Sequence, residues 1–142
     1  MCLLDSVSRW DEQAVVCIAS SHRNIDNPLR VHDRLGASCG IEYAAQAMAV
    51  HGALLATANQ SRPSAGFLIS VRGTTLHVSR LDNIAADLVI EARCISANNE
   101  HILYQFSIHA ADQILLDGRA AVVVNADIVI PILPIETLGT QT

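Results

Sequence analysis

The chain has 142 residues, of which 51% are hydrophobic and only 16% are charged, and its formal net charge is −5 at pH 7. This length predicts a single domain with a substantial core. The basic residues form no stripe with interleaved aromatic side chains, so nucleic acid is not an expected partner. A composition more apolar than one small domain needs predicts that part of the surface is buried against another subunit.

Four cysteines are scattered through the chain: Cys2, Cys17, Cys39 and Cys94. They form no C-x-x-C pair and no secretory signal pattern accompanies them, which predicts free thiols and a cytoplasmic location. The one long apolar segment, residues 41–58, is interrupted by Glu42, Gln46 and His51, so no membrane span is expected. Histidine, cysteine and acidic residues do not recur at metal-ligand spacing, and we expect no metal and no other cofactor.

Along the chain, the expected elements are two strands, a loop, one helix and then further strands. Apolar runs at residues 1–7 and 14–19 predict the first two strands, joined by a turn at 10–13. The polar stretch 20–36 predicts a long loop, and residues 41–58, apolar on nearly every face, predict a buried central helix. Strands are then expected at 66–72, 74–81, 84–97, 101–110 and 114–124, with a bend or bulge near Asp117-Gly118.

Together these elements predict an α+β hotdog fold. An antiparallel sheet with one apolar face needs a cover, and only one helix is available, so the sheet must wrap that helix. Residues 1–125 form this domain, and residues 126–142 form a C-terminal tail that either lies along a neighbouring surface or is disordered. Hotdog subunits usually pair to extend the sheet and place sites at the interface.

The predicted helix carries a single acid, Glu42, in its first turn. A negative charge is favoured there by the helix dipole, which would by itself explain the residue. Gln46 follows one turn later on the same face, whereas His51 falls on the opposite face. An acid in an otherwise apolar helix, with an amide beside it, indicates a catalytic role, and partial burial would favour a protonated Glu42 that can donate to a leaving hydroxyl.

The helix start also carries a family resemblance. Its sequence is Gly40-Ile41-Glu42-Tyr43-Ala44-Ala45-Gln46-Ala47. This segment resembles the helix of the hotdog 3-hydroxyacyl-(acyl carrier protein) dehydratases, in which a catalytic carboxylate is followed by glutamine in an E-x-x-A-Q pattern. With Asn27-Pro28 and Leu35-Gly36-Ala37 before it and the strand order after it, the segment is most similar to the predicted dehydratases of aryl-polyene-type clusters.

The resemblance implies elimination of water from a 3-hydroxyacyl thioester, carried on acyl carrier protein or coenzyme A, to give an enoyl thioester in fatty-acid or polyene synthesis. In the family a histidine removes the proton next to the thioester carbonyl, and a helix carboxylate handles the departing hydroxyl. Backbone N–H groups at the helix start bind the thioester oxygen. On this chain the resemblance implies Glu42 as the acid, Gly36 and Gly40 as donors close to the substrate, and Gln46 and Tyr43 as substrate-binding or orienting residues.

The histidine departs from the family pattern. The main dehydratase family carries it in a G-H-F-P-G segment, and this chain has Pro28 at that offset. The loop holds His22 and His32, and His32, ten residues before Glu42, is the expected base. The alternative is that His32 is an exposed loop residue.

Two other functions stay open at this stage. An acyl-thioester hydrolase can use the same fold and carboxylate to activate water, and the missing G-H-F-P-G segment leaves room for a non-catalytic partner of another hotdog subunit. The expected assembly is a homodimer or a hetero-oligomer with another hotdog subunit. An acyl tunnel would then lie between the helix and the neighbouring subunit, lined by residues such as Tyr43 and Met48.

Overall fold

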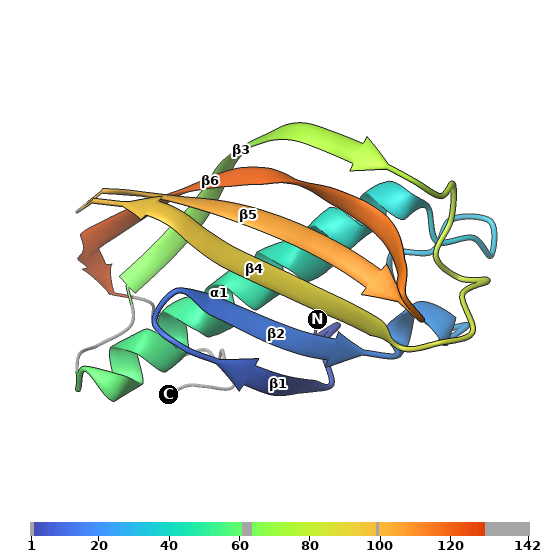
Figure 1. Ribbon diagram of the computed structural model, residues 1–142, viewed down its shortest axis with the longest axis horizontal. Coiled ribbons are helices and arrows are strands. Elements are labelled where there is room, and N and C mark those ends of the chain that lie inside the picture. Colours follow the sequence, from blue (N-terminus) through green and yellow to red (C-terminus); the bar gives the residue numbers. More distant parts are fainter. Residues whose placement is uncertain (1, 61–63, 99, 130–142) are drawn as a thin grey trace.

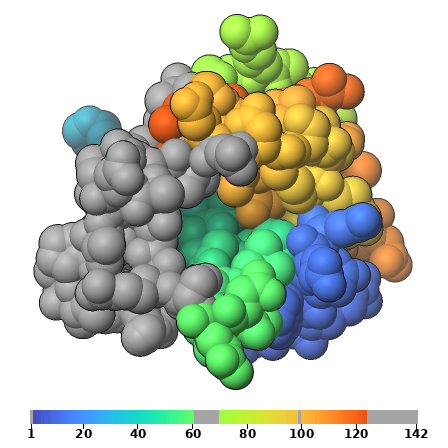
Figure 2. All heavy atoms as spheres, turned by 90° about the vertical axis from the view of Figure 1, so that its left-hand side faces the viewer, coloured from blue at the N-terminus to red at the C-terminus, as the bar shows by residue number. Residues whose placement is uncertain are grey.

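A computed structural model describes residues 2–60, 64–98 and 100–129, without the side chains of 64–69 and 124–129. Its one α-helix, α1 (Gly40–Ala58), lies against a six-stranded antiparallel sheet (Figure 1). The strand order across the sheet is β1 (Ser6–Trp10), β2 (Ala14–Ala19), β4 (Leu88–Ala97), β5 (His101–Ala110), β6 (Gln113–Val129) and β3 (Ser64–Leu76). Seen along the helix, the sheet curves around it, with the β1–β2 hairpin on one side and β4 and β5 above (Figure 2). The predicted hotdog fold is confirmed.

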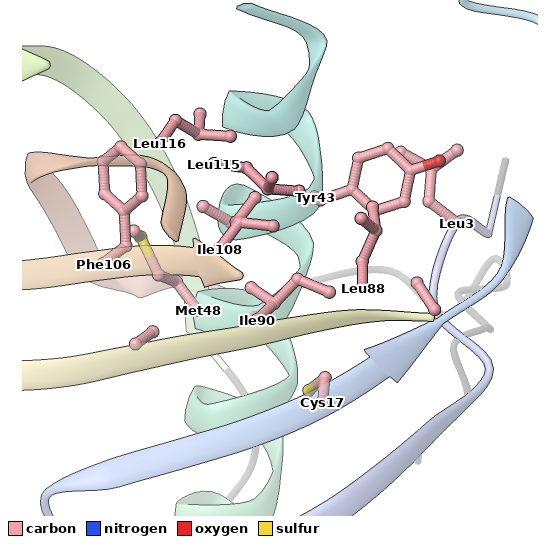
Figure 3. Close-up of a cluster of buried hydrophobic side chains, with 14 of the residues drawn as sticks. Leu3, Cys17, Tyr43, Met48, Leu88, Ile90, Phe106, Ile108, Leu115 and Leu116 are labelled. Atoms are coloured by element: carbon pink, nitrogen blue, oxygen red, sulfur yellow. The ribbon is translucent and has the colours of Figure 1, made fainter. Parts of the chain in front are cut away.

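The helix is held by the side chains that it turns toward the sheet. Tyr43, Ala44, Ala47, Met48 and His51 are buried, at the spacing of one helical face. They meet alternate residues of the strands, so one apolar face of the sheet is covered by one helix (Figure 3). In Figure 3 the ring of Tyr43 points toward Leu3 and Leu88. The expected helix over 41–58 is therefore confirmed to within a residue at its start.

Tyr43 and Met48 do not line a surface of this chain. Tyr43 is 0% and Met48 5% exposed, and both belong to the core between α1 and the sheet. The expectation that they line a tunnel facing a neighbouring subunit is wrong for the described chain. Successive residues of a helix point in directions about 100° apart, so Tyr43 faces the sheet while the preceding Glu42 does not.

Two strand predictions match and others shift. The strands at 14–19 and 101–110 are found with those bounds. The first strand runs over Ser6–Trp10 instead of 1–7, because Leu3 is a core residue whose N–H donates to the Gln46 side chain. The expected strands at 66–72 and 74–81 are one strand that ends at Leu76, and the strand expected from residue 84 begins at Leu88.

The expected bulge near Asp117-Gly118 has a counterpart in β6 at Leu115, which is the extra residue opposite β5, and directly at Gly118 the extra residue lies in β3. Arg72 pairs with Arg119 and Thr75 with Asp117, so two residues of β3 stand opposite Gly118. Strand β6 continues to Val129, so residues 126–129 of the expected tail belong to it, and the rest of that tail lies outside the described residues. Within the described ranges no helix is both long and apolar enough to cross a membrane.

Candidate active site

Glu42 lies in the first turn of α1, and its side chain is exposed. Because the following Tyr43 and Ala44 face the sheet, Glu42 is turned away from it. The partial burial that would favour a protonated Glu42 is not present in the single chain. An exposed carboxylate at this position remains available to a substrate or to a second subunit.

Gln46, one turn further on, is committed to the start of the chain. Its Oε1 accepts a hydrogen bond of 2.8 Å from the backbone N–H of Leu3. This bond fixes the N-terminal segment across the helix. Gln46 therefore has a structural task that the E-x-x-A-Q pattern does not reveal.

Only some of the amides expected to bind an oxygen are free to do so. The N–H of Ala37 donates to Ser79 O at 3.1 Å, and that of Cys39 donates to Gly36 O at 3.0 Å. The N–H of Gly40 donates to the carbonyl oxygens of Ala37 and Ser38, which belong to the short helix η2 (Ala37–Cys39). Within the described part of the chain, the N–H groups of Gly36 and Ser38 make no hydrogen bond. These two amides are the donors that the helix start leaves for a ligand.

The two glycines of the predicted site differ in what surrounds them. A Cβ on Gly40 would lie 2.8 and 2.9 Å from the methyl carbons of Leu116, so Gly40 lets the helix approach β6. A Cβ on Gly36 would meet only Ser38 Oγ, at 3.9 Å. Gly40 is thus required by packing, whereas the space beside Gly36 is open.

The loop before the helix is pinned by a charged pair that sequence patterns did not indicate. Arg80 and Asp82 form an ion pair, and Asp82 Oδ1 accepts the N–H of Leu35 at 2.9 Å. The hydrogen bonds from Arg80, and then from Leu35, hold the pKa of Asp82 well below its usual range. Since Gly36 follows Leu35, this pair positions the amides at the helix start.

His32 stands at the tip of a tight turn. Val31 and Arg34 exchange both backbone hydrogen bonds, at 2.9 and 3.0 Å, and His32 and Asp33 between them have φ values of 53° and 63°. These angles define a turn of type I′, which projects His32 into solvent. Among the described residues, His32 and Glu42 form no hydrogen bond or ion pair with each other, and both side chains are exposed.

His22, the other histidine of the loop, is a structural residue. It is 0% exposed, and its Nε2–H donates to the carbonyl oxygens of Ile84 and Ala86 at 3.0 and 3.1 Å. Burial lowers the pKa of His22, so the ring is neutral near pH 7. Its Nδ1 has no partner among the described groups. A ring closed off in this way does not reach a substrate.

Asn27 and Ser21 complete a buried polar cluster around Tyr43. The Tyr43 hydroxyl lies 2.7 Å from Ser21 Oγ and 3.1 Å from Asn27 Nδ2. The sequence shows Asn27 only as part of an Asn-Pro turn, and no local signal indicates that its amide reaches Tyr43. These bonds give Tyr43 a structural role in place of the substrate contact expected for it.

The remaining reactive side chains form no second site. The four cysteines are unpaired, as expected, and burial raises the pKa of Cys17 to about 11. His51 is fully buried, between Tyr104 OH at 2.8 Å and Asp11 O at 2.9 Å. Among the described residues, no group of three or more histidine, cysteine or acidic side chains is arranged to hold a metal ion.

The family of the chain follows from its sequence as a whole. Residues 1–129 match the model of the ApeP-like family, which is described as ApeP dehydratase. The chain belongs to this family of hotdog dehydratases, so the predicted class and the predicted dehydratase function are confirmed. A search of curated proteins found no significant match.

Solved structures share the fold. The dehydratase heterocomplex ApeI:P from Xenorhabdus doucetiae aligns over 87% of this chain and 83% of that chain, with 20% identity and a TM-score of 0.79. The thioesterase HI1161 from Haemophilus influenzae aligns over 84% and 76%, with 11% identity and a TM-score of 0.61. A hypothetical thioesterase from Streptococcus pneumoniae TIGR4, solved with coenzyme A, aligns over 84% of each chain, with 11% identity and a TM-score of 0.62. At these identities the likeness extends to the fold alone.

Proposed function

We propose that this chain eliminates water from a 3-hydroxyacyl thioester in the cytoplasm, with Glu42 as the acid and His32 as the base. The thioester is carried on acyl carrier protein or coenzyme A. The observation that supports this most is the helix start, where an exposed carboxylate follows, a few residues on along the chain, the unengaged N–H groups of Gly36 and Ser38. Family membership supplies the reaction class.

In the proposed step, the His32 ring takes a proton from the carbon between the hydroxyl-bearing carbon and the thioester carbonyl. The electron pair of that C–H bond forms the new C=C bond as the C–O bond breaks. Glu42, protonated where the proposed second subunit covers it, gives its proton to the departing hydroxyl, which leaves as water. The N–H groups of Gly36 and Ser38 stabilise negative charge on the thioester oxygen, a contribution that is often the largest in such reactions.

The proposal includes a second subunit. His32 and Glu42 form no hydrogen bond with each other among the described residues, and β3 lies at an edge of the sheet. Leu76, at the end of β3, is 47% exposed, which is unusual for a leucine paired with the buried Leu116. We propose that a second copy or another hotdog subunit pairs along β3 and brings its His32-bearing loop, or its own base, to Glu42. The name of the ApeI:P heterocomplex supports the second arrangement.

The test is the rise of enoyl absorbance from a 3-hydroxyacyl thioester, measured with the chain alone and with a hotdog partner subunit. Glu42→Gln and His32→Asn should each lower the rate on the order of a hundredfold or more, as loss of a general acid or base does. Asparagine is the better replacement at His32, because it adopts the positive φ of this position at a lower cost than alanine. His101→Asn, at another exposed turn, is the matched control and should keep full activity.

Two other outcomes correspond to other functions. Release of free thiol without enoyl product would indicate a thioesterase. This alternative is considered because two thioesterases share the fold. Full activity of His32→Asn in the presence of a partner would place the base on that partner. The exposed, unconnected position of His32 makes that second result the more informative one to look for.

A further inference from the structure

A row of arginines crosses the outer face of the sheet, which is turned away from α1. Register pairs run from Arg72 on β3 to Arg119 on β6, then to Gln105 on β5 and to Arg93 on β4. All four are exposed, and the residues that alternate with them on β5 and β6 face the core. Figure 1 looks onto this face, where β4, β5 and β6 pass in front of the helix. Three of the chain's nine basic residues are thus aligned.

Arg72 and Arg119 stand directly opposite each other on adjacent strands. Such neighbours have Cβ atoms about 4.5–5.5 Å apart, and like charges there are destabilising. Arg93 has a weak partner, with its Nη2 at 3.5 Å from Glu91 Oε2. Among the described residues, no carboxylate pairs with Arg72 or Arg119. The chain has a net charge of −5, yet these two cations face each other. A bound anionic ligand would relieve their repulsion.

The acid that precedes Arg119 on β6 is also engaged. Asp117, two residues before Arg119, accepts a hydrogen bond of 3.0 Å from His77 Nε2. This contact draws the carboxylate toward the end of β3 and away from an ion pair with either arginine. The guanidinium donors of Arg72 and Arg119 are therefore available to an anion. The negative charge of Asp117 repels such an anion and offsets part of this attraction.

A hollow of about 600 Å³ lies over these residues. Its polar lining consists of Arg72, Arg119, Ser70, Gln105 and the Asp117 carboxylate, and Leu103 and Ala121 are apolar. A volume in the range of about 300–1,000 Å³ accommodates a small organic molecule, and a lone inorganic anion would leave most of it empty. The combination of two cations with an apolar surface favours a ligand that is anionic at one end.

We propose that this hollow binds the phosphate group of a small organic phosphate. Arg72 and Arg119 hold the phosphate oxygens with their planar forks of donors, which match phosphate better than a single ammonium would. Gln105 and Ser70 add neutral donors, and the organic part lies on Leu103 and Ala121. This site is on the opposite side of the sheet from the core and does not depend on the function proposed for Glu42.

Calorimetric titration at low salt with matched probes tests the proposal. The probes are 4′-phosphopantetheine against pantetheine, and adenosine monophosphate against adenosine, with inorganic phosphate as a fifth. We expect only phosphorylated organic probes to bind in the micromolar range, and the better of the two pairs identifies the organic part. Binding of inorganic phosphate alone, or no binding below millimolar concentration, would overturn the proposal.

Substitutions then locate the site. Arg72→Gln and Arg119→Gln should each weaken binding about tenfold or more, consistent with loss of one charge-assisted contact. Asp117→Asn should tighten it severalfold, because a repelling charge is removed while an acceptor for His77 is kept. Arg9→Gln, an exposed arginine of β1 at the other edge of the sheet, should change nothing. Equal weakening by Arg9→Gln would mean general charge attraction and would refute the site.

Folding provides an independent readout for the same variants. Because the facing arginines repel each other, Arg72→Gln should melt no lower than the wild type. A variant that keeps its melting temperature and loses the probe separates a binding role from a structural one. A marked loss of stability in both arginine variants would instead show that the arginines stabilise the folded chain, and would contradict a binding role.

Discussion

Replacement of Tyr43 by phenylalanine tests whether this residue serves the fold or the substrate. The hydrogen-bond directions follow from the partners. Ser21 Oγ donates to the carbonyl oxygen of Leu3 at 2.8 Å, so its own proton is used and Tyr43 must donate to Ser21. Asn27 Nδ2 in turn donates to the Tyr43 oxygen at 3.1 Å. The hydroxyl thus links Asn27 to Ser21 in one buried chain of bonds.

The expected cost comes from two lost bonds. Tyr43 is 0% exposed, and Tyr43→Phe leaves one N–H of Asn27 without an acceptor, although the amide keeps its second bond to Ser21 O at 2.9 Å. A buried donor left unpaired costs about 1–3 kcal/mol of the free energy of unfolding. For a chain of this size, that corresponds to a melting temperature lower by about 3–9 °C.

The assay is urea or thermal unfolding at one fixed protein concentration, since association also shifts the midpoint. Ser21→Ala and the double variant complete a cycle, and we expect the two changes to be coupled because they share a bond. In the dehydration assay, the KM of Tyr43→Phe should equal that of the wild type. An unchanged stability together with a raised KM would refute the structural role and restore the substrate contact.

Three further changes should have equally specific results. Gly40→Ala should destabilise the fold by about 1–3 kcal/mol, because its methyl group meets Leu116, whereas Gly36→Ala should unfold like the wild type in the same urea titration. Burial lowers the pKa of His22 below its usual value of about 6.5, so the unfolded chain takes up a proton before the folded one as pH falls. The free energy of unfolding should therefore decrease from pH 7.5 to pH 5.5, and urea titrations should show a smaller decrease for His22→Gln. Tyr104→Phe should lose about 1–2 kcal/mol in thermal unfolding, since it leaves His51 Nδ1 unpaired.

Local patterns predicted the elements in which side chains alternate without a break. The alternation in β5 is uninterrupted, so His101–Ala110 could be read directly from the sequence. The same alternation over residues 77–81 is misleading. There the backbone bonds to the loop before the helix, with Leu81 N–H donating to Leu35 O at 2.8 Å and Ala37 N–H to Ser79 O at 3.1 Å. Such long-range contacts leave no periodic trace in a single sequence.

The candidate site was predictable as a position and less so as a set of contacts. Helix polarity and the family pattern both indicate Glu42 at the helix start. They do not show that Gln46 is bound to Leu3, or that the adjacent Tyr43 turns inward. In our proposal His32 acts across two subunits, and a single sequence carries no local pattern for a distance between subunits.

The N-terminal segment enters the core at its third residue. Leu3 is 1% exposed and its amide is held by a side chain of α1. Chain ends usually fray and exchange their amide hydrogens within the shortest times measured. Here the amide of Leu3 should exchange as slowly as the middle of the helix, because it is released only when the helix and the sheet separate. A folded partner joined directly before Leu3 would therefore adjoin the cooperative unit, and a spacer is needed to keep it from straining the fold.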